Sequence, residues 1–234
     1  MFKFFRKKLK ILLYTDSRGD NIPGHTDYEH YGDLLAKKYN VEKYLCPEKW
    51  TTTLDFLDLI KKRDTKNYDL VILHTGIVDH SPRHQQVAIN NIYKDKREIF
   101  DEVFGKKIIQ DYLNSDFGPE YEGDKTVNLY SLEMAKEFLL PKLNEIPNLL
   151  WISSNRIIPG WNGNYWKPRP ENISIIEEYS NLFLTELDSN NVIDLMTWSN
   201  KDIKKFTFDN MHPTKAGSDY IYEEILRKVK NKFG

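Results

Sequence analysis

Five short apolar segments, separated by longer stretches with helical spacing, constrain the fold of this chain more than any other feature. They lie at residues 10–14, 41–45, 70–74, 149–153 and 192–195. The third contains the uninterrupted run Leu70-Val71-Ile72-Leu73, which is typical of a strand that is covered on both faces. Strands that alternate with helices in this way form a parallel sheet with helices on both sides. We therefore predict a three-layer α/β fold with a five-stranded parallel sheet, and we prefer a flavodoxin-like strand order.

The stretches between these segments place apolar residues on one helical face. Helices are predicted over residues 31–39, 53–62, 89–107, 132–143, 175–187 and 214–234. Two segments that contain glycine and proline, residues 115–125 and 159–170, are predicted to be loops rather than linkers, because apolar periodicity resumes promptly on each side. A chain of 234 residues can fill one α/β domain and leaves little room for two, so we predict a single domain over residues 1–234.

Composition argues against several classes of function. The chain has 34 Lys and Arg against 35 Asp and Glu, so it lacks the basic surface of a nucleic-acid-binding protein. Its single cysteine, Cys46, rules out an internal disulfide and a multi-cysteine zinc site. No run of about eighteen apolar residues predicts an integral membrane segment. The apolar run Ile11-Leu12-Leu13-Tyr14 is too short for a secretory signal. We therefore expect a cytoplasmic protein, and its oligomeric state stays open.

Polar segments come after three of the predicted strands, and the last of them opens the final helix. The segments are Thr15-Asp16-Ser17-Arg18-Gly19-Asp20, Thr75-Gly76-Ile77-Val78-Asp79-His80-Ser81-Pro82-Arg83 and Asp209-Asn210-Met211-His212-Pro213. In doubly wound sheets, ligands bind beyond the carboxyl ends of the strands, where these segments should meet. A serine hydroxyl becomes a nucleophile when an oriented base removes its proton. We predict Ser17 as nucleophile, His212 as base and Asp209 as the group that orients it. Taken singly, Ser17 and Asp209 could equally be helix N-caps.

These blocks resemble the motifs of the SGNH (GDSL-type) hydrolases, a family of esterases and acyltransferases. Thr15-Asp16-Ser17-Arg18-Gly19 stands where the family has Gly-Asp-Ser, and Gly76-Ile77-Val78-Asp79 where it has Gly-x-Asn-Asp. Asp209-Asn210-Met211-His212-Pro213 matches the Asp-x-x-His-Pro signature. The blocks occur in family order and span nearly the whole chain.

The resemblance implies that Ser17 attacks an ester carbonyl, that His212 is the base and then the acid, and that the reaction passes through an acyl-enzyme. It also implies that neither a metal nor another cofactor is needed. An oxygen ester of a small acyl group on a carbohydrate is the expected substrate. Without an export signal, acyl transfer during polysaccharide biosynthesis is as plausible as hydrolysis.

Two departures affect the oxyanion hole. The family's third-block asparagine, a side-chain donor, is replaced by Val78, which cannot donate. The second-block glycine has no counterpart in residues 46–52, although Lys49 or Trp50 could present a backbone N–H there. Arg18, His80 or Arg83 could supply the missing side-chain donor, whereas Asp79 is expected to brace its loop. If nothing does so, the chain would be a carbohydrate-binding pseudoenzyme.

The loop over residues 159–170 contains Trp161 and Trp166, whose rings could stack on a sugar. In that case Asn162, Asn164 and Arg169 would bond its hydroxyls. Alternatively, the aromatic residues simply anchor the loop under neighbouring helices.

A metal-dependent phosphoesterase is the third functional hypothesis. Asp16, Asp20 and Asp79 could together bind Mg²⁺. His80 and His84 are four residues apart, but the intervening Pro82 argues against a helix-borne metal pair. We therefore predict no metal site.

Overall fold

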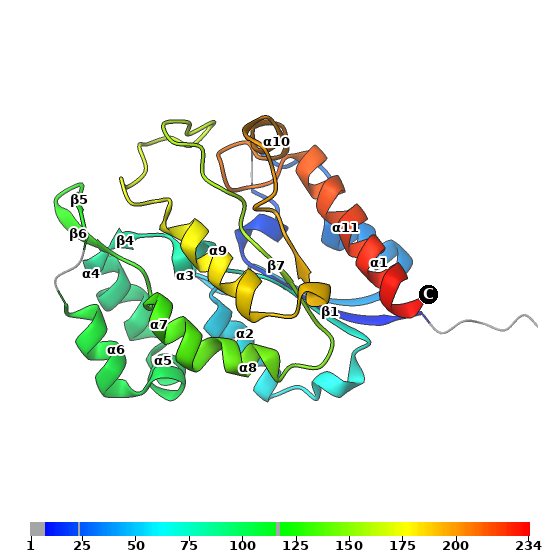
Figure 1. Cartoon of the computed structure of the whole chain (residues 1–234), viewed down its shortest axis with the longest axis horizontal. Coiled ribbons are helices and arrows are strands. Elements are labelled where there is room, and N and C mark those ends of the chain that lie inside the picture. Colours follow the sequence, from blue (N-terminus) through cyan, green and yellow to red (C-terminus); the bar gives the residue numbers. More distant parts are fainter. Residues whose placement is uncertain (1–7, 23, 116–117) are drawn as a thin grey trace, which may run out of the picture.

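The central feature of the computed structural model, which describes residues 8–22, 24–115 and 118–234, is a five-stranded parallel sheet. Its strands run in the order β2-β1-β3-β7-β8 (Figure 1), which is the flavodoxin-like order. The strands are β1 (Lys10–Thr15), β2 (Asn40–Leu45), β3 (Leu70–His74), β7 (Leu149–Ile152) and β8 (Val192–Ile193). The predicted fold class and strand order are confirmed.

Alternation along the central strands divides the core into two halves. Leu12, Tyr14, Val71 and Leu73 face one hydrophobic cluster, whereas their neighbours Ile11, Leu13, Leu70 and Ile72 face the other. All eight side chains are buried. A strand whose successive residues enter opposite cores must be apolar at every position, which is why Leu70-Val71-Ile72-Leu73 reads as a continuous run.

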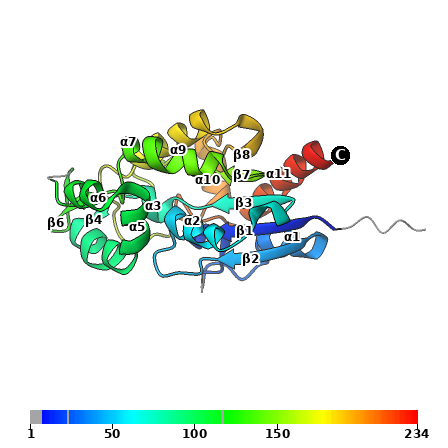
Figure 2. The ribbon, with the colours of Figure 1, turned by 90° about the horizontal axis from the view of Figure 1, so that it is seen from below.

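Helices cover both faces of this sheet (Figure 2). One face carries α1 (Tyr31–Lys38), α10 (Asn200–Phe206) and α11 (Lys215–Phe233). The other carries α2 (Thr53–Lys61), α5 (Arg97–Phe104), α6 (Lys106–Leu113), α7 (Leu132–Met134), α8 (Leu140–Asn144) and α9 (Ile175–Glu186). Within the described residues, no helix is long and apolar enough to cross a membrane.

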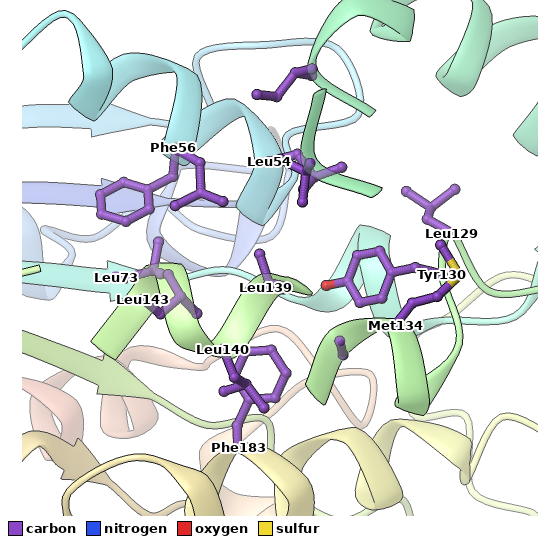
Figure 3. Close-up of a cluster of buried hydrophobic side chains, with 14 of the residues drawn as sticks. Leu54, Phe56, Leu73, Leu129, Tyr130, Met134, Leu139, Leu140, Leu143 and Phe183 are labelled. Atoms are coloured by element: carbon purple, nitrogen blue, oxygen red, sulfur yellow. The ribbon is translucent and has the colours of Figure 1, made fainter. Parts of the chain in front are cut away.

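The larger half of the core is built around α2 and the helices that face it. Phe56 from α2, Leu140 from α8 and Phe183 from α9 are fully or almost fully buried. Figure 3 shows these side chains gathered in one cluster, with Tyr130 and Met134 at one end of it. The helices on this face thus hold the carboxyl ends of β1 and β3 from one side.

The predicted helix over residues 89–107 is wrong in its extent. The chain forms α4 (Gln85–Val87), the π-helical segment η3 (Ala88–Tyr93), α5 and α6 in succession. Gly105, between α5 and α6, has φ of 85°. A positive φ is incompatible with a right-handed helix, so the apolar pattern continues through a sharp turn that periodicity alone does not register.

A small antiparallel sheet lies beside the main fold. Its order is β4-β6-β5, with β4 (Arg83–His84), β5 (Glu120–Tyr121) and β6 (Asp124–Val127). The predicted loop over residues 115–125 is therefore partly a hairpin, with Glu122 and Gly123 at positive φ in its turn. Strands of two to four residues are too short to show alternation. The remaining short helices are α3 (Ile77–His80) and the 3-10 turns η1 (Ser17–Gly19), η2 (Thr65–Asn67) and η5 (Ser189–Asn191), with a π-helical segment η4 (Ala135–Leu139).

Candidate active site

Three predicted site residues meet beyond the carboxyl ends of the sheet. Ser17 Oγ lies 3.0 Å from His212 Nε2, and His212 Nδ1 lies 2.8 Å from Asp209 Oδ2. The Ser17–His212 contact joins positions 195 residues apart. The His212 side chain is 18% exposed and that of Asp209 is 4% exposed. A hydroxyl, an imidazole and a carboxylate in this order can move a proton from the serine to the histidine while the carboxylate orients the ring.

A buried ion pair between Asp16 and Arg18 holds the segment that follows β1 and carries Ser17. Asp16 caps the turn η1 by accepting the backbone N–H of Arg18 at 3.0 Å. Its carboxylate also accepts two bonds from the Arg18 guanidinium, at 3.0 and 2.9 Å, and one from the backbone N–H of Ile77 at 3.1 Å. Burial alone would raise the pKa of Asp16, but the charge and hydrogen bonds of Arg18 outweigh it and lower the pKa. This pair fixes the start of η1 against the segment after β3.

Asp209 and His212 form a compact turn of their own. Asp209 Oδ1 accepts the backbone N–H of Met211 at 3.1 Å and that of His212 at 2.7 Å. Asn210 adopts a left-handed conformation with φ of 76°, which asparagine tolerates better than most residues. Its side chain bonds to the backbone of Ile158 and Trp161 and so ties the turn to the segment after β7. The i,i+3 spacing of Asp209 and His212 therefore brings their side chains into contact locally.

Burial and hydrogen bonding oppose one another at Asp209. Burial acts to raise the pKa of this carboxyl group. The hydrogen bonds and charge of His212, and then the charge of Arg169, outweigh burial and lower the pKa. Asp209 is thus held as a carboxylate, the form that can stabilise a protonated imidazole.

A pocket of about 400 Å³ opens over Ser17. Its wall is mixed in character, with apolar, aromatic and cationic side chains. Besides Ser17 and His212, it is lined by Trp50, Ile77, Val78, Ser81, Pro82, Arg83, His84, Val87, Tyr121, Tyr165, Lys167, Arg169, Pro170, Ile173 and Met211. The small sheet contributes Arg83, His84 and Tyr121, so the predicted loop that forms β5 becomes part of the wall.

The oxyanion side of this pocket lacks a side-chain amide. Val78 lines the pocket, and its side chain cannot donate a hydrogen bond. Ser17 is the first residue of η1, so its N–H has no partner within that turn. Trp50 also lines the pocket and has a positive φ of 59°. Both residues therefore stand on the wall of the pocket.

Arg83 is the side-chain donor on this side. Its guanidinium donates to the carbonyl of Val78 and lies 5.6 Å from the centre of the Trp50 ring. Its Nε atom is buried without a partner, and no carboxylate of the described residues forms an ion pair with it. Burial lowers the pKa of Arg83 to about 10, so the group remains a cation near neutral pH. It can stabilise negative charge that develops in the pocket.

Several expected pocket residues instead hold the loops behind it. Arg18 was expected to be a possible side-chain donor in the pocket, but it does not line the pocket. Its guanidinium instead donates to Asp16 and, at 2.8 Å, to Ser154 Oγ. Asp79 is buried and accepts from Thr53 N–H at 2.9 Å and from the Tyr130 hydroxyl at 3.1 Å. It therefore braces the loop, as expected, rather than facing the pocket. His80 is likewise turned inward, with its ring 4.5 Å from that of Tyr179.

Gly76 contributes backbone shape rather than a donor. It has φ of 127° and is the N-cap residue that precedes α3. A Cβ atom at this position would lie 2.8 Å from the His80 ring. Glycine is therefore required by both the conformation and the close ring, and Gly76 sets the path of the chain toward Val78.

The two tryptophans of the 159–170 loop do not line the pocket. Trp161 packs against the hydrophobic cluster around α10 and α11, which agrees with the anchoring alternative. Trp166 is 80% exposed, and the Lys167 ammonium lies 4.9 Å from its ring. The structure thus favours the anchoring alternative for Trp161, which is partly buried against that cluster. Trp166 stands outside the pocket.

The same loop supplies pocket residues that the sequence did not single out. Tyr165 and Lys167 line the pocket, and Arg169 contacts Asp209 rather than open space. Tyr121 from the small sheet also lines the pocket, and its hydroxyl donates to the carbonyl of Pro168 at 2.7 Å. The aromatic and basic residues gathered over residues 165–169 were the available signal, but their side-chain directions depend on how the loop folds back.

A metal site has no support in the described residues. They contain no group of three or more His, Cys, Asp or Glu side chains placed to hold a metal ion. Of the three aspartates in the phosphoesterase hypothesis, Asp16 is engaged by Arg18.

Comparisons with known proteins point to one fold. No protein-family model and no curated protein sequence matches the chain. Among solved structures, a lipase/acylhydrolase from Enterococcus faecalis is similar with a TM-score of 0.53 and 18% identity, covering 96% of each chain. A protein from Lactobacillus plantarum has a TM-score of 0.52 and 14% identity over 97% of this chain and 99% of its own. A protein described as a GDSL-like lipase from Parabacteroides merdae has a TM-score of 0.50 and 11% identity over 96% of each chain. The chain has the SGNH/GDSL-type hydrolase fold.

Proposed function

We propose that this protein is a serine-dependent acyl ester hydrolase or O-acyltransferase. The observation that carries the proposal is the alignment of Ser17, His212 and Asp209, at 3.0 and 2.8 Å, on the wall of a pocket. The fold supports it, since two of the similar structures bear lipase names. Fold likeness alone does not assign chemistry, and the proposal therefore depends on the site.

The proposed reaction has two stages. Ser17 Oγ bonds to the acyl carbon while its proton passes to His212 Nε2. The bond between the acyl carbon and the alcohol oxygen then breaks, and the alcohol leaves with that proton. Water, or a second alcohol, repeats the sequence in reverse and releases the acid or a new ester. Asp209 keeps the ring of His212 oriented in both stages.

Negative charge develops on the carbonyl oxygen in each stage. We assign its stabilisation to the backbone N–H of Ser17, a backbone N–H from the loop that contains Trp50, and the Arg83 guanidinium. Arg83 takes the place of the asparagine that Val78 replaces. A charged donor in a partly dehydrated pocket can substitute for an amide, because its hydrogen bonds to an anion are the stronger kind.

For the substrate we propose an acetylated carbohydrate. A pocket of about 400 Å³ is of a size for a small acyl group with part of its alcohol. The rings of Trp50, Tyr121 and Tyr165 on its wall suit the apolar face of a sugar. This assignment rests on aromatic lining and size, and it is narrower than the reaction class.

The reaction class can be tested with 4-nitrophenyl acetate and a fluorophosphonate probe. Wild-type protein should hydrolyse the ester and become labelled at Ser17, and Ser17→Ala should lose both properties. Ser81→Ala is the matched control, since Ser81 lines the same pocket and should leave labelling intact. Equal hydrolysis by wild type and Ser17→Ala would reject the proposal.

The missing amide at Val78 favours one other function, a carbohydrate-binding pseudoenzyme of the same fold. It predicts binding of an oligosaccharide by the wild-type protein without hydrolysis and without labelling of Ser17. The same two assays, with a sugar-binding measurement beside them, separate the two functions.

A further inference from the structure

Arg169 makes contacts that a pocket-lining residue does not need. Its guanidinium donates to the backbone carbonyl of Asp209 at 2.6 Å and to Asp209 Oδ2 at 3.2 Å. Another nitrogen of the same group lies 3.1 Å from the Met211 sulfur. The guanidinium also stacks 3.9 Å from the centre of the Tyr165 ring. Arg169 is therefore fixed on the carboxylate from several directions.

The contact between Arg169 and Asp209 affects the charge next to His212, because both residues bond to the same oxygen of Asp209. Asp209 Oδ2 accepts both from His212 Nδ1 and from Arg169, while Asp209 Oδ1 is taken by two backbone N–H groups. The side chains of Arg169 and Asp209 are 10% and 4% exposed, so water screens this pair weakly. A permanent positive charge at Oδ2 offsets part of the negative charge that would otherwise stabilise a protonated His212.

Among the described residues, the other charged groups near His212 on the pocket wall form no ion pair with Asp209. Arg83, His84 and Lys167 share the pocket wall, and Lys167 is paired with Glu122 at 2.8 Å. On the opposite side, the Phe208 ring stacks on His212, and His25 stacks on Phe208. Within the described residues, the ion pairs of Asp209 are those with His212 and Arg169.

The loop that carries Arg169 is held to the same turn at a second point. Asn164 N–H donates to the carbonyl of Phe208 at 2.8 Å. Gly163 makes this approach possible, since a Cβ there would overlap that carbonyl oxygen and φ is 53°. The loop is yellow-green between β7 and α9 in Figure 1. It thus contacts Phe208 through Asn164 and Asp209 through Arg169.

We propose that Arg169 is a positioning residue, which holds the Asp209 carboxylate on His212 and offsets part of the negative charge that this carboxylate presents to the imidazole. The proposal deepens the proposed function and rests on it for its meaning in catalysis. The electrostatic effect of Arg169 on His212 depends only on the folded structure and not on whether the protein is an esterase. The loop over residues 159–170 then has two roles: it holds Asp209 against His212, and it forms part of the pocket wall.

The test compares Arg169→Met, Arg169→Lys and a control. Removing the cation should stabilise protonated His212, so the acidic limb of the kcat/KM profile should move to higher pH by about 0.5–1 unit. The kcat/KM at its optimum should fall about tenfold to a hundredfold as the carboxylate loses its alignment. Arg169→Lys should restore the limb, because it keeps the charge, but only part of the rate. Arg156→Met removes a guanidinium that donates to the Trp198 carbonyl instead, and should leave the limb in place.

An NMR titration of the His212 ring in the same variants gives a readout that does not depend on activity. Its midpoint should move upward in Arg169→Met and stay near wild type in Arg169→Lys. A midpoint and a limb that do not move in Arg169→Met would overturn the proposal, even if the variant is slower or less stable. Absence of esterase activity in the wild type, with the midpoint shift still present, would instead remove the proposed function and leave the electrostatic role standing.

Discussion

Ser17 is flanked by two regions that are built differently. On one side, Asp209 and His212 belong to a single turn, and each polar atom of the carboxylate has a partner. On the other side, Trp50 comes from one segment and Val78 and Arg83 from another, and the cation among them has a backbone carbonyl as its acceptor. The first region is a complete hydrogen-bonded network, whereas the second is open to a ligand.

This difference separates two tasks of an acyl-transfer site. Proton transfer needs groups whose distances are set before the substrate arrives, and a short-range turn supplies them. Stabilisation of the oxyanion needs donors whose partner appears only during the reaction. A pocket-lining Arg83 whose guanidinium donates to a backbone carbonyl, and a valine in place of an amide, therefore belong to the side where new charge is expected. The predictions below test whether the two sides divide the work in this way.

The largest effect should come from the proton-transfer side. His212→Ala removes the base, and we expect kcat for 4-nitrophenyl acetate to fall at least about 10⁴-fold. His25→Ala is the control, because His25 stacks on the far face of Phe208 and should cost little. A His212→Ala enzyme with near wild-type kcat would show that another group activates the serine.

The oxyanion side should produce a smaller loss. Arg83→Met removes the charged donor, and we expect kcat to fall about 10²–10³-fold, the cost of one oxyanion-hole donor. KM for a neutral ester should change little, since the interaction strengthens only in the transition state. A change in KM alone would mean that Arg83 binds substrate rather than the oxyanion, and the two sides would then not divide as proposed.

Asp79, which braces the loop behind the oxyanion side, should affect the free energy of unfolding rather than the reaction rate. Burial raises the pKa of Asp79 to about 7 in the folded protein. Its stabilising contribution is then full below about pH 4 and is lost as the pH rises toward 7, because unfolding lets the carboxyl group ionise. Asp79→Asn cannot ionise, so urea unfolding should show wild type losing about 1–3 kcal/mol relative to the variant between pH 4 and 7.5. Parallel stability profiles for the two proteins would contradict the raised pKa.

The smallest effect tests whether the oxyanion side is already complete. Val78→Asn restores the family's amide donor. In wild type it should change kcat less than about tenfold, since Arg83 already serves, whereas in the Arg83→Met background it should recover at least about tenfold. Equal gains in both backgrounds would mean that the amide and Arg83 act independently. No gain in the Arg83→Met background would show that residue 78 does not reach the oxyanion.

Much of the architecture was predictable because it depends on local patterns. Runs such as Leu70-Val71-Ile72-Leu73 and the apolar stripe of α11 follow from burial on regular elements. The segments that were missed are short or irregular. α10 buries only Ile203, and its signal was the capping pair Ser199 and Asp202. The small sheet has strands too short for periodicity and forms because distant segments align.

The candidate site divides in the same manner. The residues of the Asp-x-x-His-Pro block identified Asp209 and His212, since their contact spans three positions and depends on one turn. The sequence did not place Arg18 and Trp161, because residue type and position after a strand do not determine where a long side chain points. Arg18 bonds to the buried carboxylate of Asp16, and Trp161 packs against the hydrophobic cluster around α10 and α11.

The sequence by itself determined the alternation of strands and helices, the segments at the carboxyl ends of the strands, and the local turn that joins Asp209 to His212. Only the tertiary structure decided that Ser17 meets His212 across 195 residues, that Arg169 reaches back to Asp209, and that Arg83 rather than Arg18 enters the pocket. The physical reason is range. Periodicity and capping act over a few residues, whereas the direction of a side chain at a loop depends on which distant groups can satisfy its charge and exclude water around it.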